Sequence, residues 1–198
     1  MLKKIFLVLS LWLGIIPVCY SAVVDGTSAG FVTVAPTDNP AGSGGPLDTY
    51  SAATKFTAPA SGGTISSMGW WCDNATEADE YQLGIYSHDA GNNKPNLLLA
   101  SSGDMAKGTT AGWKTGTVAY GFTGNTVYWL AAQLDDTATV TNIDYTTNAS
   151  YKEDYRGSST ELLATWGTST GTLGRILSIY ALYTSTANII VGTVISES

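Results

Sequence analysis

The sequence predicts an all-β fold, an antiparallel β-sandwich resembling a jelly roll, with about ten strands. Gly, Ser and Thr are frequent, and charged residues make up only 13% of the chain. This composition is typical of strands joined by tight turns and not of long helices. From Tyr50 onward, short apolar stretches alternate with turn signals, which is the spacing expected of a sandwich.

The N-terminus has the three parts of a secretory signal. Lys3 and Lys4 precede an apolar run over residues 5–18, and small or polar residues follow as far as Ala22. The run is shorter than the roughly 20 residues that cross a bilayer. We therefore expect residues 1–22 to be a cleaved signal peptide and the exported form to begin within residues 20–24. Residues 23–198 should form a single domain, secreted or at the cell surface, with no membrane span.

Charge excludes one class of partner. Lys3 and Lys4 leave with the signal peptide, so the mature chain keeps seven of the nine basic residues against sixteen acidic ones, a formal charge of −9. Such a chain is repelled by nucleic acid. It also keeps a single cysteine, Cys72, which cannot form an internal disulfide and is expected to be a small buried residue.

The elements follow from the apolar stretches. Residues 23–49 form a loop-rich N-terminal edge with one edge strand at Phe31–Val34. Turns are expected at Asp89–Pro95 and at Gly124–Asn125. Single helical turns could form at 76–80 and 151–156. The other expected strands are 53–56, 64–71, 81–86, 97–101, 113–118, 126–133, 139–145, 162–166, 175–184 and 188–195.

Alternation indicates which strand faces are buried. Residues 81, 83 and 85 share one face of their strand, and that face is apolar. Neither face of the stretch 127–133 is polar, so we expect a central strand covered on both sides. The residues expected in the core are Tyr81, Leu83, Ile85, Tyr128, Leu130, Ile176 and Ile179.

Four segments occur in a recognisable order: KFTAPASGGTI at 55–65, YQLGIYS at 81–87, KPNLLLA at 94–100 and VYWLA at 127–131. Together they resemble the secreted β-sandwich modules called choice-of-anchor domains, and their jelly-roll relatives in bacterial surface proteins and phage-borne adhesive proteins. The resemblance covers roughly residues 50–135. It implies an extracellular accessory or adhesive module and carries no shared catalytic site.

Catalytic patterns are weak. Gly26–Gly30 reads GTSAG, but the nucleophile-elbow motif has meaning only between a strand and a helix, and neither is expected there. The one imidazole, His88, is expected on a surface turn beside Asp89. We therefore expect no enzyme.

Acidic residues cluster in loops, where calcium could find the oxygen ligands that it prefers. The alternatives are a solvated surface or a glycosidase pair, whose separation the sequence cannot give. The residues expected to hold calcium, if it binds, are Asp73, Glu77, Asp79, Asp135 and Asp136.

Aromatic residues offer another kind of site. Trp70 and Trp71 should point to opposite faces of one strand. Trp113 and Trp166 lie beside turns, where a ring can be exposed and can stack on a sugar. The expected ligand-binding residues are Trp71, Trp113, Trp166, Asp73, Asn74 and Asn92.

These observations favour an exported, non-catalytic binding module that recognises a glycan or another cell-surface ligand. One alternative is a structural protein that assembles with copies of itself, as in a surface layer, a fibre or a virion decoration. A small secreted hydrolase is a third.

Overall fold

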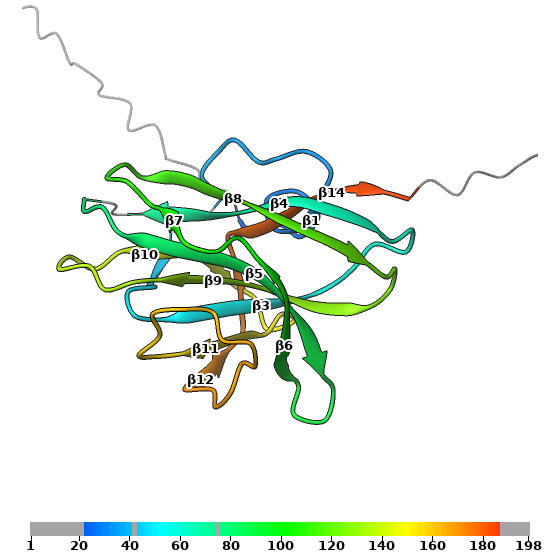
Figure 1. The fold of residues 1–198 in the computed structure, drawn as a ribbon. Helices are drawn as coiled ribbons and strands as arrows, with labels where there is room; N and C mark the ends of the chain where they lie inside the picture. The colour runs from blue at the N-terminus through cyan, green and yellow to red at the C-terminus, as the bar shows by residue number, and fades with distance from the viewer. Residues whose placement is uncertain (1–21, 41–42, 74–75, 187–198) are drawn as a thin grey trace, which may run out of the picture.

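The computed structural model describes residues 22–40, 43–73 and 76–186. Two seven-stranded sheets lie one above the other as a mostly antiparallel β-sandwich, which confirms the predicted fold class (Figure 1). These residues form no helix, and hence none that could cross a membrane. The predicted signal peptide (except Ala22) and the strand predicted at 188–195 lie outside the described residues.

Sheet I runs in the order β1-β14-β4-β10-β13, with β8 on β4 and β2 on β10. β1 is parallel to β14, and the other pairs in this sheet are antiparallel. The strands are β1 (Gly30–Val32), β2 (Ser43–Pro46), β4 (Gly63–Asp73), β8 (Gly112–Phe122), β10 (Asn142–Thr147), β13 (Arg175–Leu177) and β14 (Ile179–Ser185).

Sheet II runs in the order β12-β11-β3-β9-β5-β6, with β7 on β5. The chain crosses between the sheets repeatedly, since β3, β4 and β5 alternate from one sheet to the other. The strands are β3 (Ser51–Thr57), β5 (Glu80–Asp89), β6 (Lys94–Ser101), β7 (Met105–Ala106), β9 (Val127–Leu134), β11 (Glu153–Arg156) and β12 (Gly171–Leu173).

β9 is a central strand buried on both faces, as its sequence predicts. It pairs with β3 on one side and β5 on the other. Tyr128 and Leu130 belong to the main core between the sheets, whereas Trp129 and Ala131 belong to a second cluster on the outer face of sheet II. The seven residues expected in the core are all buried, and so is Cys72.

A loop, and not the strand predicted at 162–166, covers that outer face. Leu162 and Trp166 pack there against Trp129. The loop is held by the N–H of Trp166, which donates to the carbonyl of Asn96 at 2.8 Å, and by the carbonyl of Ala164, which accepts from Leu98 at 2.9 Å. Leu162 and Trp166 are therefore buried by packing on the sheet, whereas Leu163 and Ala164 between them are exposed.

Two predicted turns are confirmed by backbone geometry. Asn93, between β5 and β6, has φ 50°, and Asn125, between β8 and β9, has φ 57°. The helical turn expected at 151–156 is wrong, because β11 occupies Glu153–Arg156. Residues 76–80 form no helical turn either, since β5 begins at Glu80.

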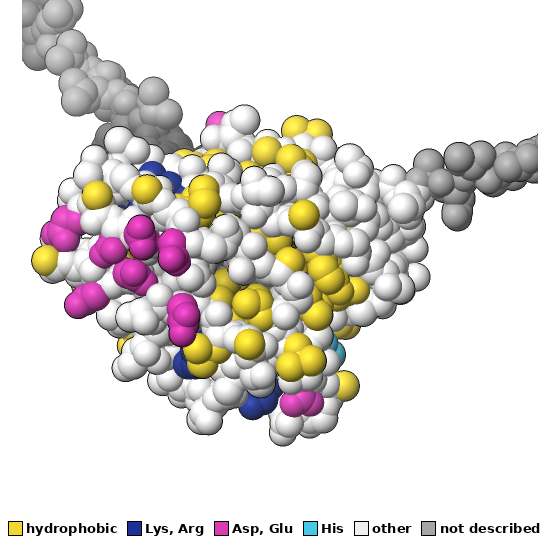
Figure 2. Space-filling model, in the orientation of Figure 1, with side chains coloured by type: hydrophobic (Ala, Val, Ile, Leu, Met, Phe, Trp, Pro, Cys, Tyr) yellow, Lys and Arg dark blue, Asp and Glu magenta, His cyan; other side chains and the backbone are white. Residues whose placement is uncertain are grey.

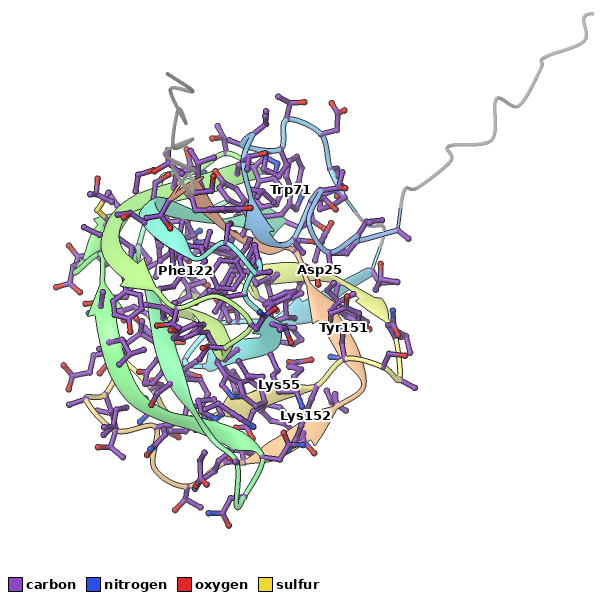
Figure 3. The ribbon with its side chains drawn as sticks, turned by 90° about the vertical axis from the view of Figure 1, so that its right-hand side faces the viewer. Asp25, Lys55, Trp71, Phe122, Tyr151 and Lys152 are labelled. Carbon is purple, nitrogen blue, oxygen red and sulfur yellow. The ribbon has the colours of Figure 1, made fainter. Side chains whose placement is uncertain are left out.

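Besides the pairing of β1 with β14, hydrogen bonds fasten the N-terminal segment to the sandwich. The N–H of Val23 donates to Oγ1 of Thr146 at 2.8 Å. The hydroxyl of Tyr151 donates to Oδ2 of Asp25 at 3.1 Å, and the two side chains lie next to each other in Figure 3. Nε1 of Trp113 donates to the carbonyl of Asp38 at 3.3 Å, so the loop after β1 passes over the outer face of sheet I.

Candidate functional site

Two of the predicted tryptophans meet on the outer face of sheet I. Trp71 on β4 and Trp113 on β8 are cross-strand partners, with ring centroids 5.6 Å apart and nearly perpendicular planes. Tyr180 on β14 also packs against Trp113, with ring centroids 5.0 Å apart. Both tryptophans are half-buried. Figure 3 shows Trp71 beside the blue N-terminal loop, which leaves this cluster only part of its surface.

The expectation that Trp166 is exposed is wrong. Its ring is 1% exposed, and Nε1 donates to Oδ1 of Asp154 at 2.7 Å. Its ring also packs perpendicular to Tyr86 at 5.0 Å. Trp166 covers the second hydrophobic cluster and offers no stacking surface.

The polar residues expected beside the tryptophans are only partly brought together. Asp73 ends β4 and shares a face with Trp71, because it lies two positions further along the strand. Asn92 lies in the turn between β5 and β6, where its amide donates to Oδ2 of Asp89 at 2.7 Å. Figure 1 shows that turn at the bottom of the molecule, remote from β4 and β8. Asn74 lies outside the described residues.

Acidic side chains gather at the end of the sandwich where β4 ends and β5 begins, at the left of Figure 2. Three of the residues expected to hold calcium there accept hydrogen bonds from nearby groups. Glu77 accepts from Thr139 Oγ1 at 2.8 Å, Asp79 from the N–H of Glu80 at 2.8 Å, and Asp135 from Gln133 Nε2 at 2.8 Å. Asp136 is exposed.

Within the described ranges, no three Asp, Glu, His or Cys side chains are placed to hold a metal ion. The carboxylates at the acidic end mainly order the connections between strands.

The residues of the weak catalytic pattern have structural partners. Oγ of Ser28 accepts from the N–H of Val24 at 3.0 Å, inside a tight loop before β1. His88 is a residue of β5 and not of a turn, and its Nδ1 accepts from Nε1 of Trp129 at 3.1 Å. Burial, followed by the positive charge of Lys55, lowers the pKa of His88. Both side chains hold the fold in place.

A separate hollow lies between the two sheets at the edge where β13 and β10 face β11. It is a cavity of about 220 Å³ with a floor of Ala52, Ile143 and Leu177. We call it the edge cup. The side chains that give it chemical character are Tyr50, Tyr145, Glu153, Tyr155, Leu173 and Arg175.

Strand alternation explains how these side chains converge. Tyr145 follows Ile143 by two residues on β10, Tyr155 follows Glu153 on β11, and Leu177 follows Arg175 on β13. Residues two apart share a face of a strand, so each pair points into the same space. Strand pairing brings these side chains together, because β10 pairs with β13, and β11 pairs with both β3 and β12.

A glycine makes room for one wall of the cup. Gly171 on β12 lies opposite Tyr155, and a Cβ at that position would come within 2.5 Å of the tyrosine hydroxyl. The ring of Tyr155 therefore lies across the glycine. It also packs against Tyr50, with ring centroids 6.0 Å apart. The two rings form one side of the cup.

The charged groups of the cup face each other. Oε2 of Glu153 lies 3.7 Å from Nη1 of Arg175, and this oxygen is buried with no hydrogen-bond partner among the described residues. The guanidinium of Arg175 lies over the ring of Tyr145, 3.8 Å from its centroid, in a cation–π contact. Burial raises the pKa of Glu153 to about 7, although the charge of Arg175 acts in the opposite direction. The cup thus presents aromatic faces, one carboxyl group and one guanidinium.

Sequence reasoning did not find the edge cup. Its residues come from stretches near positions 50, 145, 155 and 175, and no motif links them. The alternation of Glu153 and Tyr155 is the one local signal, and two residues are too few to distinguish a strand from a helical turn. The site exists only through the pairing of the strands.

Comparison with known proteins finds no matching family model, no matching curated protein and no matching solved structure. The resemblance to choice-of-anchor domains stays a prediction.

Proposed function

We propose that this protein is an exported, non-catalytic binding module that holds a glycan in the edge cup. The observation that carries the proposal is the combination of three tyrosines with one carboxyl group and one guanidinium around a 220 Å³ hollow. Binding sites are typically apolar and aromatic hollows with a few convergent polar groups, and the edge cup fits that description.

Tyrosine suits a sugar ligand in particular. Its ring offers a flat apolar face, and its hydroxyl can donate or accept a hydrogen bond. Sugar rings have apolar C–H faces bordered by hydroxyls, so one tyrosine can meet both kinds of surface. Tyr50, Tyr145 and Tyr155 are all half-buried, which leaves part of each residue within reach of a ligand.

The arrangement of carboxyl groups supports binding over hydrolysis. Glycosidases generally use two carboxyl groups on either side of the scissile bond. Among the described residues that line the edge cup, Glu153 is the only acidic one. Its neighbour Asp154 is 1% exposed and is engaged by Trp166 on the opposite face of β11. A glycan in the cup would meet one carboxyl group.

A glycan array probed with the purified domain tests the proposal. Wild-type protein should bind a defined subset of glycans, and Leu173→Trp should reduce that binding at least tenfold. Leu173 lines the cup and is 38% exposed, so a larger side chain can obstruct the cup while the core stays intact. Circular dichroism and the melting temperature of the variant check that it is folded.

Two further variants separate the edge cup from the sites suggested by sequence. Trp113→Ala alters the outer cluster of sheet I, and His88→Ala removes the imidazole. Both should bind the same glycans within about twofold of wild type. A loss confined to Trp113→Ala would move the site to the Trp71–Trp113 cluster and overturn the assignment to the cup.

Absence of binding to every glycan would contradict the proposed function. Electron microscopy and gel filtration of the same preparation would then decide whether the protein self-assembles into fibres or layers.

A further inference from the structure

Glu153 has an unmet hydrogen-bonding requirement that faces the edge cup. The residue is 5% exposed, and its Oε2 has no hydrogen-bond partner within the part of the chain that the structure describes. Leaving a buried polar atom unpaired is costly, and the cost is larger for a charged group. A ligand hydroxyl in the cup would supply the missing partner.

Arg175 supplies the complementary group. A guanidinium carries five N–H donors and no acceptor. Among the described residues, the side chain of Arg175 makes the 3.7 Å ion pair with Glu153 and stacks over Tyr145, and neither interaction is a hydrogen bond. Its side chain is 26% exposed, so donors remain available to an acceptor that enters the cup.

Because Glu153 and Arg175 carry opposite charges, the cup disfavours charged ligands of either sign. An anionic ligand that approached Arg175 would also approach the carboxyl group of Glu153. A cationic ligand attracted to Glu153 would meet Arg175, which already stacks on Tyr145. A hydroxyl group both donates and accepts, so it can pair with Glu153 whether that carboxyl is ionised or protonated. Two adjacent hydroxyls on one neutral ring would satisfy both side chains.

The size of the cup limits how much of a glycan enters. Pockets for drug-sized ligands have volumes of roughly 300–1,000 Å³. The edge cup, at about 220 Å³, is smaller. One sugar ring is the part of a glycan that suits this space, and a ring at the end of a chain can enter where an internal ring, linked on both sides, cannot.

We infer that the edge cup selects an uncharged sugar residue at the end of a glycan and holds two adjacent hydroxyls of that residue between Glu153 and Arg175. This inference rests on the proposed function, because it names the ligand class of the same site.

The experiment compares three kinds of glycan on one array. The probes are oligosaccharides that end in a neutral hexose, the same oligosaccharides with a terminal uronic acid or hexosamine, and longer chains in which the neutral hexose is internal. Wild-type protein should bind the neutral terminal residue at least tenfold more tightly than the other kinds. Equal or tighter binding of the charged ends, or of the internal residue, would overturn the inference and leave the proposed function standing. Failure to bind any glycan would instead contradict the proposed function itself.

Matched substitutions test the two hydrogen-bonding residues. Glu153→Leu should weaken binding of the neutral glycan at least tenfold, whereas Glu153→Gln should stay within about threefold because an amide still donates and accepts. Arg175→Met, which keeps an apolar stem, should also lose at least tenfold. Melting temperatures identify any variant that has lost its fold. If folded Glu153→Leu or Arg175→Met protein binds as tightly as wild type, the role given to that residue is wrong.

Discussion

Nε1 of Trp166 donates a 2.7 Å hydrogen bond to the buried carboxylate of Asp154, and the indole covers the outer face of sheet II. The bond joins β11 to the loop that follows it. The guanidinium of Arg156 lies 5.8 Å from the ring centroid of the same indole. Trp166 precedes a glycine in the sequence, which suggests an exposed ring. In the structure it is instead part of the packing on the outer face of sheet II.

Replacing that indole tests the packing role. Trp166→Phe should lower the free energy of unfolding by about 1.5–3 kcal/mol, because it removes a hydrogen bond to a charged group. Urea denaturation measures it. Leu163→Ala, in the same loop but 38% exposed, is the control and should change stability by no more than about 0.5 kcal/mol. Similar losses of stability in both variants would mean that the Trp166–Asp154 hydrogen bond adds nothing to the stability that the loop provides.

A core substitution tests the strand register. Ile85→Ala should cost about 2–5 kcal/mol, because Ile85 is fully buried between the sheets and a cavity would remain. Leu97→Ala, at a position that is 50% exposed, should cost much less. Chemical denaturation of both proteins gives the comparison. A cost below about 0.5 kcal/mol for Ile85→Ala would be incompatible with the observed pairing of β5 and β9.

Two glycines at the β8–β9 end of the molecule should respond in opposite ways to alanine. A Cβ on Gly124 would come within 2.1 Å of the carbonyl oxygen of Ala60, so the backbone must shift. We expect Gly124→Ala to destabilise the fold by about 1–3 kcal/mol. Apart from its chain neighbours, no described residue comes within 4 Å of a Cβ on Gly121, so Gly121→Ala should be neutral or slightly stabilising. Thermal melts distinguish the two, and equal stability of both variants would contradict the close approach at Gly124.

Glu153 should make stability depend on pH. Burial raises its pKa from an ordinary 4.5 to about 7 in the folded protein, so the folded state binds this proton more tightly than the unfolded state. The stability that this group contributes is therefore greatest below about pH 4.5, falls as the pH rises to about 7 and is constant above that. Asp144, whose pKa burial and the nearby Asp73 raise from 3.8 to about 7, acts in the same direction.

Glu153→Gln removes the first of these contributions. The variant should gain stability relative to wild type as the pH is raised from 5 to 8, as measured by urea denaturation at both values. Glu161→Gln, which removes an exposed acidic charge, is the control. If the stability difference between Glu153→Gln and wild type does not change with pH, Glu153 titrates the same way in the folded and unfolded states.

The sequence by itself determined the sandwich class, the principal strands and the core. Alternation along residues 81–85 gave the buried face of β5, and the apolar stretch at 127–133 identified the central strand. These predictions succeed because the pattern of a strand is local: residues two apart share a face, and an apolar face must be covered. The positive φ angles of Asn93 and Asn125 are likewise a property of residue type and turn position.

Only the tertiary structure decided what lies in contact across the sandwich. The segment 162–166 is apolar like a strand, and whether it pairs with a sheet or packs on one depends on residues far along the chain. Glu153 and Arg175 are separated by more than twenty positions, and they meet because β11 and β13 lie in opposite sheets at the same edge. Such a site depends on strand order and register, which are set by packing over the whole molecule and have no signature in a short stretch of sequence.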